Sequence, residues 1–235
     1  MYSIMNTAPS HLEFDVAPYR LSGVVYGTLL NHQPAIAALD AAARQPPYKA
    51  PAKAPVLYVK PRNTLIGHGD AVSVPVDAPE LEIGASLGIV IGRTACRVTE
   101  EQALDYVAGY TIVSDISVPH DVFYRPSIRL KARDGFCPVG PAVVPCSEIA
   151  NPDTLAVRVY MDGALVHSTT TGERRRTVAR LLADVSEFMT LSPGDVLMLG
   201  VSAGAPRVRA GQQVRIEIEG VGQLDNRFVN EGASQ

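Results

Sequence analysis

The period of apolar and polar positions changes along this chain. From residue 56 onward, short apolar runs alternate with turn signals, which is the pattern of β-strands. Asp162-Gly163, between two of these runs, is typical of a tight hairpin turn, and the Pro-Gly-Asp triplet at 193–195 is typical of another turn. The predicted strands, together with one earlier apolar run, cover residues 21–30, 56–61, 71–76, 86–92, 110–117, 142–145, 155–161, 164–171, 195–200 and 214–220.

Three stretches have helical character instead. Residues 31–44 are rich in alanine with Pro34 near the first turn, and Thr99 with Gln102 forms a capping-box pattern ahead of a second helix. Because strands outnumber helices and do not alternate with them, we predict an α+β fold built on antiparallel or mixed sheets. The third helix is predicted at residues 177–189, where one apolar stripe recurs at helical spacing: Val178, Leu181, Leu182, Val185 and Phe188.

The composition fits one large domain. The 235 residues are 46% hydrophobic and 19% charged, so the chain has enough apolar surface to form a core. The net charge of −3 excludes a globally basic nucleic-acid binder. Four prolines within residues 45–55 predict an extended connector at the end of an N-terminal segment, 1–54, ahead of the main domain, 55–235.

Cysteine usage and the absence of targeting patterns indicate where the protein works. The three cysteines, Cys96, Cys137 and Cys146, form no CxxC pair, which favours neither a disulfide framework nor a zinc site. The first residues lack the basic and apolar segments of a secretory signal, and no apolar stretch approaches the roughly 20 residues that cross a bilayer. We therefore expect a cytoplasmic protein that binds neither nucleic acid nor membrane.

Three carboxylates are candidates for chemistry. Asp115 directly follows an apolar run, where it can bind a divalent cation, act as a base or simply cap a turn. Glu80 and Glu82 share one side of a strand if the segment is extended, so they can either chelate a hard cation together with Asp115 or form an exposed strand face.

A cationic segment follows at residues 124–134. If this segment is extended, Arg129, Lys131 and Arg133 share one face and make a site for carboxylates, to which Arg125 adds a fourth cation. The alternative is a solvated edge strand, where such charges prevent aggregation. Three consecutive arginines at 174–176 either meet an anion or partner, or lie in a solvated turn.

Six stretches taken together resemble the fumarylacetoacetate hydrolase family and occur in that family's order. They are residues 56–64, 87–93, 103–117, 130–141, 190–200 and 214–226. The resemblance implies a β-rich mixed sandwich roll in which residues 55–235 form the catalytic domain. It also implies a divalent cation, Mg²⁺ or Mn²⁺, that is held by acidic residues and chelates a 2-oxo or 2-hydroxy-enol carboxylate.

The resemblance assigns roles to particular residues and also shows departures. Asp115 matches the family's acidic metal ligand, and Lys131 matches its active-site lysine. Gly84 and Ser86 stand where the family has two metal-binding glutamates, and Ala35 stands where it has a histidine. Glu80 and Glu82, four residues earlier, are then the remaining acidic candidates for a metal site.

Residues 31–64 and 118–141 are similar to the N-terminal half of the decarboxylase/isomerases of homoprotocatechuate (4-hydroxyphenylacetate) degradation. This similarity implies decarboxylation of 5-oxopent-3-ene-1,2,5-tricarboxylate, isomerisation of 2-hydroxyhepta-2,4-diene-1,7-dioate, or both. Lys131 would stabilise the dienolate, and His120 or Asp121 would move the proton. The expected cationic contacts of the di- or tricarboxylate substrate are Arg125, Arg129, Arg133, Lys60 and Arg62.

Two alternatives remain open on the same residues. The missing glutamates also fit a catalytically degenerate subunit that supports an active paralogous half, whereas an acylpyruvate hydrolase is disfavoured by Ala35. Because some relatives fuse two such halves, we expect this chain to form a homo-oligomer or a hetero-oligomer with a paralogous subunit.

Overall fold

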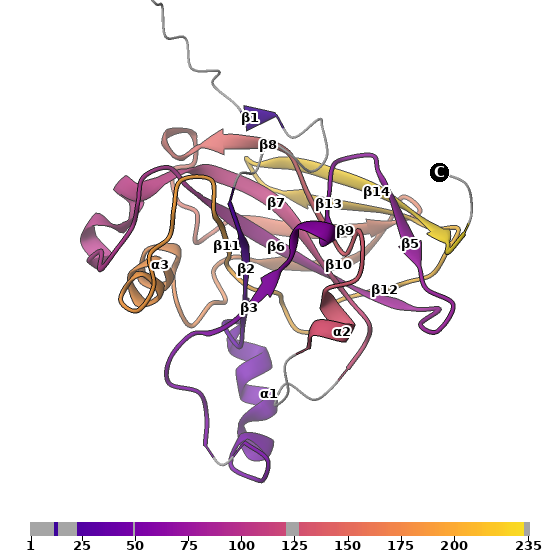
Figure 1. Cartoon of the computed structure of the whole chain (residues 1–235), viewed down its shortest axis with the longest axis horizontal. Coiled ribbons are helices and arrows are strands. Elements are labelled where there is room, and N and C mark those ends of the chain that lie inside the picture. The colour runs from indigo at the N-terminus through magenta and orange to yellow at the C-terminus, as the bar shows by residue number, and fades with distance from the viewer. Residues whose placement is uncertain (1–11, 14–22, 49, 121–126, 233–235) are drawn as a thin grey trace, which may run out of the picture.

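A computed structural model describes residues 12–13, 23–48, 50–120 and 127–232. Two mixed β-sheets dominate, with few helices (Figure 1). The nine-stranded sheet has the path β1-β8-β7-β6-β11-β2-β3, with β12 beside β6 and β4 beside β8. Its strands are β1 (Leu12–Glu13), β2 (Val25–Leu29), β3 (Val56–Lys60), β4 (Leu65–Ile66), β6 (Leu81–Ile91), β7 (Val107–Ser117), β8 (Cys137–Pro145), β11 (Val196–Met198) and β12 (Arg207–Val208).

The second sheet has five strands in the order β10-β9-β13-β14-β5. They are β5 (Ala71–Val74), β9 (Ala156–Met161), β10 (Ala164–Thr170), β13 (Gln213–Ile218) and β14 (Gly222–Asn230). The described helices are α1 (Gln33–Ala43), α2 (Ile128–Lys131) and α3 (Val178–Ser186), with short 3₁₀ turns η1 (Arg62–Thr64), η2 (Glu100–Tyr106) and η3 (Cys146–Glu148).

The α+β fold is confirmed, and its sheets are mixed because β2–β11, β4–β8 and β5–β14 pair in parallel while the remaining pairs are antiparallel. The predicted hairpin turn is present between β9 and β10. Asp162 and Gly163 have φ values of 50° and 82°, which is the left-handed pair that a tight hairpin needs.

Strands β6 and β7 divide the molecule into a core side and a site side. Successive side chains of a strand point to opposite faces. Leu81, Ile83, Leu87 and the other odd-numbered residues of β6 belong to the core between the sheets. The even-numbered positions of β6, from Glu82 onward, therefore face the other way, and so does Asp115 of β7, which is paired with Gly84.

The N-terminal segment contributes to the main sheet. β2 pairs with β3 and with β11, and α1 follows it directly. Figure 1 shows α1 projecting from the edge of the sheet that β2 and β3 form. In the part of the chain that the structure describes, no helix has the length and apolar character to cross a membrane.

Local sequence signals explain α3 but misplace its last apolar residue. The Thr177 hydroxyl accepts a hydrogen bond from the Arg180 backbone N–H, which caps the first turn. Leu181 and its stripe neighbours are fully buried. Phe188, the last residue of the predicted stripe, lies beyond the end of the helix at Ser186 and is 62% exposed.

Two other predictions need correction. The stretch after Thr99 forms 3₁₀ turn η2 rather than an α-helix, and the Thr99 side chain makes no capping hydrogen bond to it. Residues 128–131 form helix α2, so the extended geometry expected for the cationic segment is wrong there. β14 was missed because Asn226 occupies a buried position between Leu224 and Phe228 and breaks the apolar alternation.

A buried and an exposed residue of the α3 stripe give a stability prediction. We expect Leu181→Ala to lower the free energy of unfolding by about 2–5 kcal/mol, because it leaves a cavity in the core. The control Phe188→Ala should change it by less than about 0.5 kcal/mol, since that ring is largely in solvent. Urea unfolding followed by circular dichroism measures both, and equal losses would contradict the placement of the helix end.

Candidate active site

A cavity of about 500 Å³ opens on the site side of β6 and β7. Its walls come from β2, α1, β3, β6, β7, α2, the loop at 201–205 and the start of β12. The lining residues are Thr28, Leu29, Leu30, Ala35, Ala38, Leu39, Tyr58, Glu82, Gly84, Asp115, His120, Lys131, Val201, Ser202, Ala203, Gly204, Ala205 and Arg207.

Asp115 is the charged centre of this cavity. Its carboxylate is 2% exposed and lies between two ammonium groups: Lys131 Nζ is 2.7 Å from Oδ2, and Lys60 Nζ is 2.7 Å from Oδ1. The Tyr58 hydroxyl also donates to Oδ2. Burial alone raises the pKa of Asp115, but Lys131 and Lys60 outweigh it and hold that pKa well below its usual range. Asp115 is therefore a carboxylate at neutral pH.

Lys60 is part of the scaffold rather than of the cavity wall. Its ammonium donates to the backbone carbonyls of Ile116, Lys131 and Phe136 at 2.8, 2.9 and 2.9 Å. These three acceptors use all three hydrogens of the ammonium group. The contact between Lys60 and Asp115 Oδ1 is therefore an ion pair without a hydrogen bond. The side chain is fully buried. Lys60 was predicted to contact substrate, but this geometry places it behind Asp115, where it fixes β7 and α2.

Tyr58 reaches Asp115 because β2 leaves room for its ring. Tyr58 and Lys60 lie two residues apart on β3, so they point to the same side. Gly27 is the partner of Tyr58 across β2 and β3, and a Cβ atom at Gly27 would fall within 2.0–2.4 Å of the Tyr58 ring. Lys131 Nζ lies 5.0 Å from the centre of that ring, a cation–π contact. Burial and the neighbouring Asp115 raise the pKa of Tyr58 well above its usual value, so it stays a hydrogen-bond donor.

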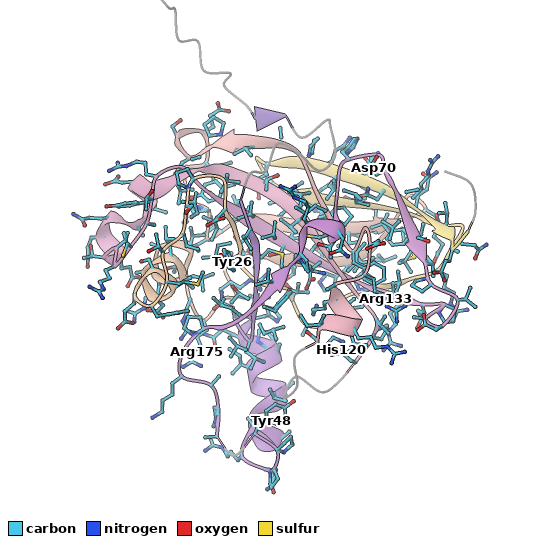
Figure 2. All side chains as sticks on the ribbon, viewed as in Figure 1. Tyr26, Tyr48, Asp70, His120, Arg133 and Arg175 are labelled. Carbon is cyan, nitrogen blue, oxygen red and sulfur yellow. The ribbon has the colours of Figure 1, made fainter. Side chains whose placement is uncertain are left out.

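Two further titratable groups line the cavity. Burial raises the pKa of Glu82, and the positive charges of Lys131, His120 and Arg207 offset this only in part. His120 Nδ1 lies 2.8 Å from the Val118 carbonyl oxygen. In the view of Figure 2, His120 lies near the end of α2 that faces α1. A carboxyl group and an imidazole therefore stand beside the Lys131–Asp115 pair.

Several predicted contacts lie away from the cavity. Arg133 makes a two-pronged ion pair with Asp77 at 2.6 and 3.0 Å, and Figure 2 shows it on the outer side of α2. The Arg129 side chain is 87% exposed, and Arg62 is exposed in η1. Because α2 is a helix, Arg129 and Lys131 point in different directions, and only Lys131 lines the cavity.

The acidic pair proposed from the sequence is split. Glu80 lies in exposed ion pairs with Arg207 and Arg209, each at 3.2 Å, and does not line the cavity, whereas Glu82 does. Asp121 and Arg125 fall outside the described residues, so their predicted roles stay predictions.

The site does not fit the divalent cation that the resemblance implies. Gly84 and Ser86 occupy the positions of the expected glutamates, and Ser86 does not reach the cavity. Both oxygens of Asp115 already face ammonium groups. Among residues 12–13, 23–48, 50–120 and 127–232, no group of three or more His, Cys, Asp or Glu side chains is placed to hold a metal ion. A hard cation with one carboxylate ligand binds weakly.

Sequence reasoning missed several wall residues. Tyr58 could have been found from its spacing to Lys60, since the two share a strand face. Arg207 and the loop at 201–205 had no signal, because they reach the cavity only through pairing of β12 with β6. For Arg174 the sequence offered contact with an anion or partner, or a solvated turn; the structure instead buries it, and it donates to the Gly200 carbonyl and the Ser202 hydroxyl beside the cavity.

A mixed sandwich roll with a cavity around a buried lysine–aspartate pair has the features of an enzyme that acts on small molecules. Comparison with known proteins identifies the family: residues 24–229 match the model of the fumarylacetoacetate (FAA) hydrolase C-terminal family. The chain belongs to the fumarylacetoacetate hydrolase family, as its sequence motifs predicted.

Relatives and solved structures place the chain more closely. It is 39% identical over 211 residues to the 4-hydroxyphenylacetate degradation bifunctional isomerase/decarboxylase of Escherichia coli, covering 90% of this chain and 48% of the relative. The chain thus spans about half the length of the curated relatives it matches.

Two solved structures share the fold. A 2-hydroxyhepta-2,4-diene-1,7-dioate isomerase from Mycobacterium marinum has a TM-score of 0.72 and 29% identity, with 90% of this chain and 76% of that chain covered. A maleylpyruvate hydrolase from Sphingobium, solved with manganese(II) and pyruvate, has a TM-score of 0.72 and 28% identity, with 88% and 70% covered. Family members thus include both isomerases and metal-containing hydrolases.

The ion pairs at Asp115 give a second stability prediction. We expect Asp115→Asn to destabilise the protein by about 3–5 kcal/mol at neutral pH, because it leaves two buried ammonium groups without their counter-charge. The matched control is Asp77→Asn, which removes an exposed partner of Arg133 and should leave stability almost unchanged. Denaturant unfolding of both variants tests this, and a stable Asp115→Asn protein would contradict the charge arrangement.

Proposed function

We propose that this chain acts on a conjugated 2-oxo or 2-hydroxy-dienoate carrying two or three carboxylates. The reaction is decarboxylation of 5-oxopent-3-ene-1,2,5-tricarboxylate, isomerisation of 2-hydroxyhepta-2,4-diene-1,7-dioate, or both. The observation that carries the proposal is the Lys131 ammonium, which faces a 500 Å³ cavity while Asp115 holds it from behind. The names of the Escherichia coli and Mycobacterium marinum relatives support the substrate class.

Decarboxylation needs a group that accepts an electron pair. When the bond to the leaving carboxylate breaks, CO₂ departs and the electron pair moves through the alkene onto the 2-oxo oxygen, which becomes a dienolate. An ammonium group at that oxygen stabilises the developing negative charge. Lys131 lines the cavity, whereas Lys60 does not, and the contact of Lys131 with Asp115 fixes its direction.

Isomerisation of the 2-hydroxydiene removes the proton of the 2-hydroxyl group, which gives the same dienolate, and then adds a proton to the carbon at the far end of the diene, which leaves a 2-oxo-alkene. This step needs a group that gives and takes a proton near neutral pH. Glu82 and His120 both line the cavity beside Lys131. The raised pKa of Glu82 favours proton exchange by that carboxyl group, so the structure adds it to His120 as a candidate.

A multiply charged substrate also requires positive charge at the cavity. The described lining carries Lys131 and Arg207, which are opposed by Asp115 and Glu82. Arg207 is the residue that pairs with Glu82 across β12 and β6, and it lines the cavity beside Glu82. We assign Arg207, in place of Arg129 and Arg133, as the second cationic contact for a substrate carboxylate.

A second candidate is a catalytically degenerate subunit. Gly84 and Ser86 favour it, because they stand where the family has two metal-binding glutamates. In that case the chain would support an active paralogous half in a hetero-oligomer; a homo-oligomer is the alternative assembly. An acylpyruvate hydrolase fits less well, because α1 presents Ala35, Ala38 and Leu39 to the cavity and no histidine.

One assay separates these candidates. The purified chain alone is mixed with 2-hydroxyhepta-2,4-diene-1,7-dioate, and loss of the conjugated chromophore is followed by ultraviolet absorbance. We expect turnover by the chain without any partner. No turnover by the chain alone, together with turnover after a paralogous subunit is added, would favour the degenerate subunit.

The role of Lys131 is tested against its neighbour on the same helix. We expect Lys131→Ala to lower kcat at least about a hundredfold, since it removes the donor that stabilises the dienolate. Arg129→Ala, two residues away with an exposed side chain, should keep wild-type kcat and KM. Circular dichroism confirms that both variants fold. A folded Lys131→Ala protein with near wild-type kcat would remove Lys131 from the mechanism.

A further inference from the structure

We propose that this cavity works without a divalent cation. The expected metal-binding glutamates are absent at positions 84 and 86, and a loop that carries Val201 packs against both positions. The ammonium of Lys131 then supplies the positive charge at the substrate oxygen. The inference rests on the proposed function for its substrate only. Its structural part concerns what positions 84, 86 and 115 contact, and it is tested independently of turnover.

The first ligand position is blocked by Val201. Gly84 is paired with Asp115 across β6 and β7, so a side chain at position 84 would lie directly beside the Asp115 carboxylate. A Cβ atom built on Gly84 falls 2.6 and 3.0 Å from the two methyl carbons of Val201, and 2.9 Å from the Asp115 carbonyl oxygen. Real Cβ contacts are longer than 3.0 Å, so a side chain fits there only if Val201 moves and the Asp115 backbone shifts slightly.

The second ligand position anchors the same loop. The Ser86 hydroxyl accepts a hydrogen bond from the Gly200 backbone N–H at 3.1 Å. Arg174 donates to the Gly200 carbonyl at 3.3 Å and to the Ser202 hydroxyl at 3.1 Å, and its guanidinium is buried. These contacts fix both sides of Val201. Gly84 therefore leaves room for Val201, and the Ser86 hydroxyl holds the backbone of the same loop.

The remaining carboxylate is committed to ammonium groups. Lys131 and the Tyr58 hydroxyl contact Oδ2 of Asp115, and Lys60 faces Oδ1 at 2.7 Å. A cation bound at Asp115 would have to displace Lys131 or lie within a few ångströms of two positive charges, which is strongly unfavourable in a buried site. Glu82 lies two residues before Gly84 on the same face of β6, and both residues line the cavity together with Val201.

The chemistry of the reaction is compatible with this arrangement. No net oxidation or reduction occurs: the electron pair from the broken C–C bond resides on the 2-oxo oxygen until a proton arrives at carbon. Lys131 stabilises that oxygen from a position fixed by its 2.7 Å contact with Asp115 Oδ2, and the electron pair can reside on the oxygen without a covalent bond between Lys131 and the substrate.

Direct Mn²⁺ binding tests the structural part. The full chain, freed of metal by dialysis against EDTA, is titrated with Mn²⁺ and followed by electron paramagnetic resonance. We expect no saturable binding up to about 1 mM, since a hard cation needs several oxygen ligands. Saturable binding that Glu82→Gln or Asp115→Asn abolishes in a folded protein would overturn the proposal.

Two engineered variants provide the matched comparison. Gly84→Glu/Ser86→Glu places carboxylates at both positions but keeps Val201, and Gly84→Glu/Ser86→Glu/Val201→Ala also removes the two Val201 methyl contacts, which leaves the 2.9 Å contact with the Asp115 carbonyl oxygen as the remaining close approach. We expect Mn²⁺ binding to rise at least about tenfold only in the triple variant, as expected when oxygen ligands are added to an open site. Equal Mn²⁺ affinity in the double and triple variants would show that Val201 is not the obstacle.

Turnover distinguishes failure of this inference from failure of the proposed function. We expect the EDTA-treated wild-type chain to convert the dienedioate at an unchanged rate, and borohydride to trap no covalent adduct on Lys131. Loss of turnover that Mn²⁺ restores would overturn the metal-free proposal and keep the function. Absence of turnover with or without metal would contradict the proposed function, while the Mn²⁺ titration still decides the inference.

Discussion

The buried carboxylate of Asp115 and its two ammonium partners are the constraint on which the site depends. Removing three charges from water is costly, and such a cluster persists only when ion pairs and hydrogen bonds offset that cost. Lys60 contributes through hydrogen bonds to three backbone carbonyls, which come from β7, from α2 and from the residue before β8. The same contacts that neutralise the charges therefore hold three separate chain segments around the cavity, and Lys131 reaches the open side as a result.

The alternation of strands β6 and β7 decides which side chains can take part. Odd-numbered residues of β6 fill the core, and even-numbered residues face the site, so Glu82, Gly84 and Ser86 were the candidates that strand geometry allowed. Only Glu82 retains a carboxyl group at the cavity. Burial raises the pKa of Glu82, which suits proton transfer. The departure at positions 84 and 86 thus changes the chemistry of one face without disturbing the core face.

The sequence was informative where a local period determines geometry. Asp115 and Glu82, which the sequence grouped as candidate ligands, both line the cavity, and the stripe of α3 identified its buried leucines. Strand parity failed for Arg129 and Arg133 because residues 128–131 are helical. It also failed for Glu80, which does not share the cavity with Glu82 because it forms exposed ion pairs with Arg207 and Arg209. The buried state of Arg174 and the position of Val201 depend on contacts between distant segments, for which a single sequence carries no pattern.

The relation between loop and ligand positions explains why a departure of this kind can be stable. A glycine at 84 without a filling side chain would leave a void beside a buried charge, and voids of that kind cost stability. Val201 removes the void, and Ser86 with Arg174 fixes the backbone that carries Val201. Reverting either ligand alone would create a clash or break an anchor. The three positions therefore depend on one another.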